Sequence, residues 1–374
     1  MTDTRVRRAW DEFRGSRFLP ATVLVLILGC AATLFVASYT YATANPKPEN
    51  IPIVVVGTLA PSTAAALEPE LEVALESSLQ VRHVDERSEA LELIDDQKVF
   101  AIIETRSGST HLALDVSGAS GQTVATLLEE SMPPVLEKAG FTVTVTDIKP
   151  LQHGDPHGLN IFYMTLASVI VGFVGAVQLG VHARSLRPWE RIGFTAAYSI
   201  LGGFGMAAVA DWLLGALDLP FVESWFILTL TLFTCGMVFT MFSSLFGRWA
   251  MIPTWLVMVL LGNPSSGGAV SWPLLPRLLA TIGGWLPPGA SVNAQHTAVY
   301  FPDHQYVWPF LVLAGWSVAR CTCGDRGRRG RGVRRANTPN AADTCLVRTK
   351  GTTLRPGRGR RVWEECGRGQ EGCG

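Results

Sequence analysis

Few residues of this 374-residue chain have the types and spacing that chemistry requires. The densest group is His153-Gly154-Asp155-Pro156-His157, whose imidazole and carboxylate side chains are metal-ligand types. Two histidines and one aspartate this close together in a loop lack the fixed geometry of a metal site. Pro156 and the flanking glycines indicate a rigid hinge instead, so we expect no bound metal.

Motifs of known catalytic chemistry are missing from the sequence. It contains no phosphate-binding loop of the form GxxxxGK[ST], no GxSxG nucleophile elbow and no HExxH pair. The chain therefore cannot hydrolyse ATP through such a loop. We expect no enzyme activity and no cofactor, and nothing in the pattern indicates nucleic acid as a partner.

The cysteines concentrate at the C-terminal end, where five of the seven lie within residues 321–374. That segment holds 13 basic and 5 acidic side chains, against 18 basic and 26 acidic ones in residues 1–320. Cys321 and Cys323 are too close for the usual zinc pairing, and no second pair follows. High charge without apolar periodicity predicts disorder over 320–374. This composition fits either a solvated basic tail or a shifted reading frame.

The elements that would position any of these residues are mostly apolar runs. Residues 18–41 contain no charged side chain, and further apolar runs extend from Leu159 to Val318. A helix of about 20 apolar residues crosses the roughly 30 Å hydrocarbon core of a bilayer. The pattern predicts a polytopic α-helical membrane protein of about six spans, placed in the lipid bilayer of the cell membrane.

Basic residues beside the spans predict the orientation, because Lys and Arg are retained on the cytoplasmic side. Five arginines lie in residues 1–17 before the first span, and Arg184, Arg187 and Arg191 follow the second. Both chain ends should therefore be cytoplasmic. We expect spans at 18–41, 159–181, 192–214, 224–246, 249–261 and 307–319. The last five spans would form a transmembrane bundle over 159–319. Within it, 263–306 is expected to be a re-entrant or extracytoplasmic segment.

Residues 42–158 alternate strand and helix patterns, which predicts an extracytoplasmic α/β domain inserted between spans one and two. Five of the seven residues in the run 51–57 are β-branched Ile or Val, as in a strand buried on both faces. The 18 acidic against 7 basic side chains fit a solvated face or the attraction of a cationic substrate. We expect the domain to fold alone. Strands are expected at 51–57, 81–84, 99–104, 111–116 and 141–148. Helices are expected at 67–79, 88–97 and 122–139. The first of these helices carries a stripe of Leu67, Leu71, Leu75 and Leu79.

One acidic residue, Asp211, falls inside the predicted third span. An ionisable residue within a span is a candidate for a transport role. It lies about three residues from the outer end, beside Trp212, where snorkelling to the interface suffices. Small residues in spans two and three predict close helix packing, in particular at Gly172, Gly175, Gly180, Gly202, Gly203 and Gly205.

Two stretches resemble a known family. They are LQHGDPHGLNIFYMTLASVIVGF at 151–173 and GNPSSGGAVSWPLLPRLLATIGGWLPPGASVNAQHTAVYF at 262–301. Both are similar to the YhgE/Pip and nitrosoguanidine-resistance membrane proteins, a group that resembles the membrane half of type-2 ABC exporters. The resemblance covers about residues 10–319 and ends at Arg320. Its most specific elements, NPSSGG and LPPGA, supply the candidate transport or structural residues Asn263, Pro264, Pro287, Pro288 and Gly289.

The resemblance implies a permease-like protein that exports a hydrophobic or amphipathic compound. Because the chain carries no ATP-binding loop, a separate ATPase subunit would supply the energy. The alternative is a non-transporting membrane scaffold or receptor, whose extracytoplasmic domain binds an envelope, phage or secretion partner. In either case we expect a homo- or hetero-oligomer.

Overall fold

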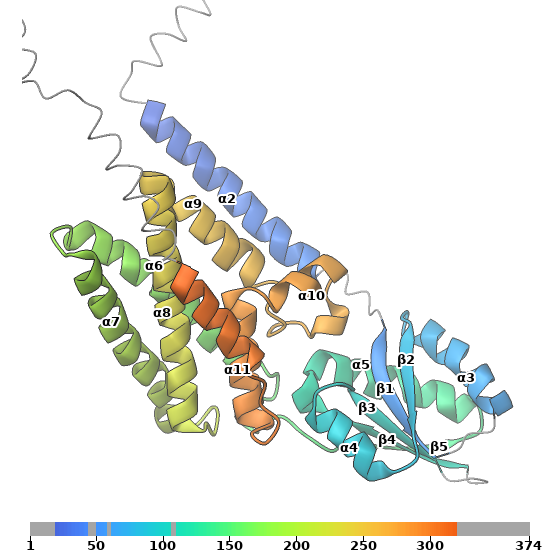
Figure 1. Ribbon diagram of the computed structural model, residues 1–374. Coiled ribbons are helices and arrows are strands. Elements are labelled where there is room, and N and C mark those ends of the chain that lie inside the picture. The colour runs from blue at the N-terminus through green and yellow to red at the C-terminus, as the bar shows by residue number, and fades with distance from the viewer. Residues whose placement is uncertain (1–18, 44–49, 58–60, 106–109, 320–374) are drawn as a thin grey trace, which may run out of the picture. The chain divides into compact units, whose positions relative to one another are not determined.

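The computed structural model describes residues 19–43, 50–57, 61–105 and 110–319 (Figure 1). This part of the chain is mostly helical and contains one small mixed sheet. The predictions for the basic segment 1–17 and for the tail 320–374 with Cys321 and Cys323 lie outside the described residues.

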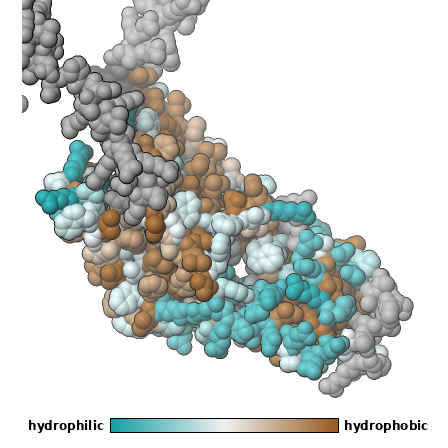
Figure 2. All heavy atoms as spheres, viewed as in Figure 1, coloured by the Kyte–Doolittle hydropathy of each residue, from teal (hydrophilic) through white to brown (hydrophobic). Residues whose placement is uncertain are grey.

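Four helices are long and apolar enough to cross a membrane, with 23 to 29 residues each. This length suits a hydrocarbon core that needs about 20 residues. Figure 2 shows hydrophobic residues gathered over the long helices. The four segments belong to α2 (Leu19–Thr43), α6 (Asn160–His182), α7 (Pro188–Ala208) with the π-helical turn η2 (Val209–Leu213), and α8 (Phe221–Phe246) with the 3-10 turn η3 (Gly247–Trp249).

Two further apolar helices, where spans five and six are expected, are shorter. They are Met251–Gly262 and Trp308–Ala319. The first begins as α9 (Met251–Trp255) and continues as the π-helix η4 (Leu256–Gly262). At a rise of about 1.5 Å per residue each covers about 18 Å, well short of the roughly 30 Å hydrocarbon core. The described residues therefore contain four candidate spans, which is consistent with a membrane protein.

Glycines allow the long helices to approach closely where α6 and α7 pack on α8 (Figure 1). A Cβ atom added at Gly172 of α6 would lie 2.6 Å from the carbonyl oxygen of Leu232 in α8. One added at Gly203 of α7 would lie 2.5 Å from the hydroxyl of Thr229, also in α8. Side chains at these two positions would push the backbones apart.

The predicted packing role holds for only some of the glycines. A Cβ added at Gly175 would lie 2.8 Å from the ring of Tyr198, and one at Gly202 would make a tight 3.3 Å contact with the end of the Leu232 side chain. Nothing lies within 4 Å of the corresponding positions at Gly180 and Gly205. The prediction is therefore wrong for these last two, which face open space.

The α/β domain contains a five-stranded sheet in the order β2-β1-β3-β4-β5. Strand β1 is parallel to β2 and β3, β4 is antiparallel to β3, and β5 is parallel to β4. All six residues of β1 are buried, as expected for an interior strand covered on both faces. The strands are β1 (Ile51–Val56), β2 (Leu79–Val84), β3 (Ala101–Thr105), β4 (His111–Val116) and β5 (Thr142–Asp147).

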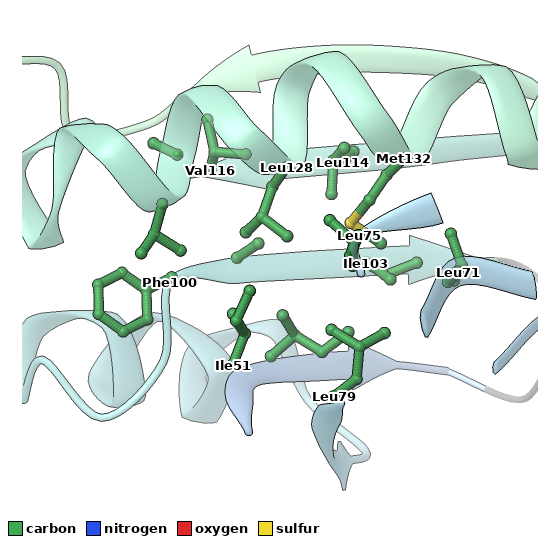
Figure 3. Close-up of a cluster of buried hydrophobic side chains, with 14 of the residues drawn as sticks. Ile51, Leu71, Leu75, Leu79, Phe100, Ile103, Leu114, Val116, Leu128 and Met132 are labelled. Carbon is green, nitrogen blue, oxygen red and sulfur yellow. The ribbon is translucent and has the colours of Figure 1, made fainter. Parts of the chain in front are cut away.

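Three helices cover the sheet. Helices α3 (Pro61–Ala74) and α5 (Gln122–Lys138) contribute to the core on one face, and α4 (Arg87–Asp95) packs on the other. Successive side chains of a strand point to opposite faces. Ile53 of β1 accordingly joins the α3–α5 core, part of which is shown in Figure 3, and Val54 joins the α4 cluster.

One detail of the predicted helix pattern is wrong. The leucine stripe was expected to continue along a helix to Leu79, but α3 ends at Ala74 and Leu79 opens β2. Glu76, with φ of 50°, adopts the left-handed conformation that ends the helix and turns the chain. Leu79 still reaches the same core as Leu71 and Leu75 (Figure 3), because both elements pack on one face of the sheet.

The core of the sheet also contains a residue from far along the chain. Leu274, in the 3-10 turn η5 (Trp272–Leu274), is 5% exposed and belongs to the α3–α5 core. Next to it, the ring centroid of Trp272 lies 5.9 Å from that of Phe100. Residues 42–158 therefore do not supply the whole core by themselves.

The glycine packing leads to a matched pair of substitutions on α6. We expect Gly172→Ala to destabilise the folded chain by about 1–3 kcal/mol, because a methyl group must be forced against the backbone of α8. Gly180→Ala, on the same helix but in open space, should leave stability unchanged or raise it slightly through its higher helix propensity. Thermal unfolding of the full chain in lipid nanodiscs measures both; equal melting temperatures would contradict the packing assignment.

Candidate functional site

A cavity of about 660 Å³ lies between the α/β domain and the segment that follows η4. This volume falls within the roughly 300–1,000 Å³ typical of small-molecule sites. The α/β domain contributes the loop after α4 and the start of α5. The later segment contributes the Ser265–Ser271 loop, the helix α11 (Pro287–Tyr300) and Tyr306.

The wall of the cavity is built from backbone segments in direct contact. A Cβ atom added at Gly283, the last residue of α10 (Arg277–Gly283), would lie 1.8 Å from the carbonyl oxygen of Ser265. A Cβ at Gly289 would lie 2.2 Å from the carbonyl oxygen of Gly283. Real Cβ atoms do not approach other atoms so closely, so only glycine fits at both positions. We call Ser265, Gly283 and Gly289 the glycine junction.

Helix α11 presents one face to the cavity. Pro287 and Pro288 occupy its first positions, where the fixed φ of proline suits a helix start and no N–H is needed. Residues three or four apart then share a face. The residues of α11 that line the cavity are Gly289, Ala290, Val292, Asn293, His296 and Tyr300.

The imidazole of His296 is held in its neutral form. Burial lowers its pKa to about 4, against the opposing effect of a hydrogen bond to the carbonyl of Ala119. His296 is only partly exposed, and it lines the cavity. A neutral imidazole that donates one N–H keeps its other nitrogen as an acceptor, so at neutral pH His296 offers hydrogen bonding without charge.

Hydrogen bonds join the loop after α4 to the segment after α11. The Asp96 carboxylate accepts from Lys98 Nζ at 2.7 Å, and its Oδ1 lies 2.9 Å from His304 Nδ1. Tyr306 donates its hydroxyl to the backbone carbonyl of Asp96 at 2.6 Å. The hydrogen bonds from Lys98 and then from His304 lower the pKa of the Asp96 carboxyl. Burial raises the pKa of the Tyr306 phenol, which therefore stays protonated as a donor.

A second tie joins the start of α5 to the Ser265–Ser271 loop. The hydroxyls of Thr123 and Ser271 lie 2.9 Å apart, and the backbone N–H of Ser271 donates to the Thr123 hydroxyl at 3.3 Å. Gly121 leaves room for this contact, because a Cβ there would lie 2.4 Å from the Ser271 hydroxyl. The loop that holds part of the cavity is thus fixed to the α/β domain.

The hinge predicted at residues 153–157 serves the start of α6. Both carboxylate oxygens of Asp155, which is buried, accept backbone N–H groups of the first turn, from Leu159 at 3.0 Å and Asn160 at 2.9 Å. His153 and His157 are exposed on either side. Groups of three or more metal-ligating side chains do not occur among the residues that the structure describes.

Hydroxyl groups attach α11 to the apolar helices. Ser291 accepts from the hydroxyl of Thr231 in α8 at 2.8 Å and lies 3.3 Å from that of Thr165 in α6. The Gln295 amide donates to the carbonyl of Ser224 at 2.9 Å. These contacts are buried, so leaving either partner unpaired would cost about 1–3 kcal/mol.

The structure places the predicted site residues at different positions relative to the cavity. Gly289 lines the cavity, and its neighbours Pro287 and Pro288 are buried in the supporting wall. Asn263 is 2% exposed beside Tyr39 of α2, and its amide nitrogen has no hydrogen-bond partner among the described residues. Pro264 is buried next to it, outside the cavity lining.

Asp211 lies elsewhere. It is half-buried in the π-helical turn η2 and does not line the cavity. His296, Tyr300 and Tyr306 were not predicted from the sequence as site residues. The spacing of Gly289, His296 and Tyr300 along one helical face was a usable signal for two of them, whereas nothing local marks Tyr306.

The glycine junction yields a second matched pair. We expect Gly283→Ala to destabilise the protein by at least about 2–3 kcal/mol and to distort the cavity, because the backbone at Ser265 has to move. The adjacent Gly284 has nothing within 4 Å, so Gly284→Ala is the control and should unfold like the unsubstituted chain. Thermal unfolding of the full chain in nanodiscs separates the two. An unaffected Gly283→Ala variant would show that the junction is not tight.

No family model matches the chain, and no curated protein matches it. The similarity of residues 151–173 and 262–301 to the YhgE/Pip proteins therefore stays a prediction. What the protein does has to be inferred from the cavity and from the helices around it.

Proposed function

We propose that this chain is a permease-like membrane protein that receives a hydrophobic or amphipathic compound in the cavity beside α11 and passes it outward. The cavity supports this proposal most directly, because it is of small-molecule size and adjoins both the polar sheet domain and the apolar helices. It borders Ile161 at the start of α6 and Trp308 at the start of the last described helix. A ligand there would meet apolar and hydrogen-bonding surface together.

The remaining parts of the proposal follow from the sequence pattern. Six spans with cytoplasmic ends would place the α/β domain and the cavity on the outer side of the cell membrane. The short helices Met251–Gly262 and Trp308–Ala319 would then be spans five and six. A separate ATPase would drive transport, as the similarity to YhgE/Pip and type-2 ABC exporters implies, and the chain would work as an oligomer.

Filling the cavity tests its role in export. Asn293 lines the cavity and its side chain is exposed, so Asn293→Trp should occupy ligand space without disturbing a packed core. We expect cells that express the chain to lose a preloaded dye such as Nile red faster than cells without it. The Asn293→Trp variant should reduce this excess efflux at least about tenfold.

The matched control is Ser88→Trp, an exposed position on α4 outside the cavity lining, which should export normally. Variants are compared at equal membrane abundance. An efflux rate that is the same with and without the chain, for Nile red and for charged dyes alike, would favour the scaffold or receptor alternative.

Single cysteines test the topology. The native cysteines among the described residues are Cys30 and Cys235. All native cysteines of the chain are first replaced. A single cysteine is then introduced, either by Ser88→Cys in the α/β domain or by Ser185→Cys between α6 and α7. Both serines are exposed in the fold. We expect an impermeant maleimide to label position 88 but not position 185 in intact cells, and both after lysis. Labelling of position 185 alone would invert the proposed orientation.

A further inference from the structure

The chemistry of the cavity wall identifies the kind of head group that it accepts, provided that the proposed function is correct. We propose that the cavity binds the uncharged, hydroxyl-rich head of an amphipathic molecule, such as the sugar of a glycosylated lipid or alkyl compound. The cavity would thus select the ligand by hydrogen bonding and ring contacts rather than by charge.

The charged groups of the wall are already paired. Although the α/β domain is acidic, Asp96 is the one carboxylate among the described residues that line the cavity. It is bonded to Lys98 and to His304, and Lys98 is the one described cationic lysine or arginine of the lining. A cationic or anionic head would lose its hydration without gaining a free counter-charge, which is unfavourable.

Most of the remaining polar groups are neutral hydrogen-bonding groups. Gln122 and Asn293 supply amides, and Ser120 and Tyr300 supply hydroxyls. His296 adds an uncharged imidazole, and His157 is the second imidazole of the lining. Donors and acceptors therefore occur together around the cavity, which suits a head group whose hydroxyls both donate and accept.

Aromatic rings complete the wall. Trp272, Tyr306 and Trp308 line the cavity, and they are 49%, 39% and 47% exposed. Such rings combine a large apolar face with a polar edge. The apolar C–H face of a sugar ring can pack on them while its hydroxyls reach the amides and serines. The tail of the ligand would extend toward the apolar helices beside Ile161 and Trp308.

The test uses four probes with one tail and different heads. Octyl β-glucoside, octanol, octyltrimethylammonium and octyl sulfate, each below its micelle concentration, are titrated calorimetrically into the full chain in phosphatidylcholine nanodiscs. Partition into lipid is removed by subtracting the heats measured with the filled Asn293→Trp variant. We expect the glucoside to bind at least about tenfold more tightly than the other three probes.

Introducing a negative charge into the wall should weaken this preference. Gln122→Glu and Asn293→Asp each place a carboxylate in the wall, and Gln122 stands at the start of α5, where an acidic side chain is well tolerated. Both variants should lower the ratio of glucoside to octyltrimethylammonium affinity at least about tenfold. Gln80→Glu makes the same amide-to-acid change at an exposed position of β2 outside the lining and should keep the original ratio.

The outcomes separate this inference from the proposed function. Equal binding of all four probes, or tighter binding of a charged probe, would overturn the neutral-head assignment but leave an amphiphile site in place. Heats that do not differ from those of the Asn293→Trp variant for any probe would overturn both. Variants with a carboxylate that leave the affinity ratio unchanged would show that the probes bind outside the cavity.

Discussion

Three backbone segments meet at the glycine junction with no side chain between them, and the architecture of the cavity depends on this contact. The loop at Ser265, the end of α10 and the start of α11 are separated in sequence, yet a single methyl group at Gly283 would collide with a carbonyl oxygen. Because α11 starts from this junction, the position of His296 and Tyr300 two and three turns further along is set by it.

Two ties then determine which elements can close the cavity. Asp96 with His304 and Tyr306 joins the α4 loop to the segment after α11, and Thr123 with Ser271 joins α5 to the loop. The first tie combines the contact between the half-buried side chains of Asp96 and His304 with a hydrogen bond from the Tyr306 hydroxyl to a backbone carbonyl. The second uses neutral hydroxyls.

Local patterns were sufficient to predict the strands of the sheet and the long apolar helices. The β-branched run at 51–57 gave an interior strand, and the long charge-free runs gave membrane-length helices, because burial on both faces and the apolar bilayer each leave a direct signature. Leu79 shows where periodicity misleads, since four leucines at helical spacing continue past the residue that ends the helix. Leu274 in the sheet core, the cavity and the role of Tyr306 could not be predicted, because they depend on contacts between segments far apart in sequence.

The capped start of α6 has a mechanical consequence. Asp155 holds the first turn of the helix with both of its oxygens, and Gln152 exchanges hydrogen bonds with the backbone of Asp218. The link from the sheet domain to α6 is thus fixed at several points instead of being a free tether. A rotation of the sheet domain would therefore tilt α6 and its neighbour α8. The linker would not absorb the rotation.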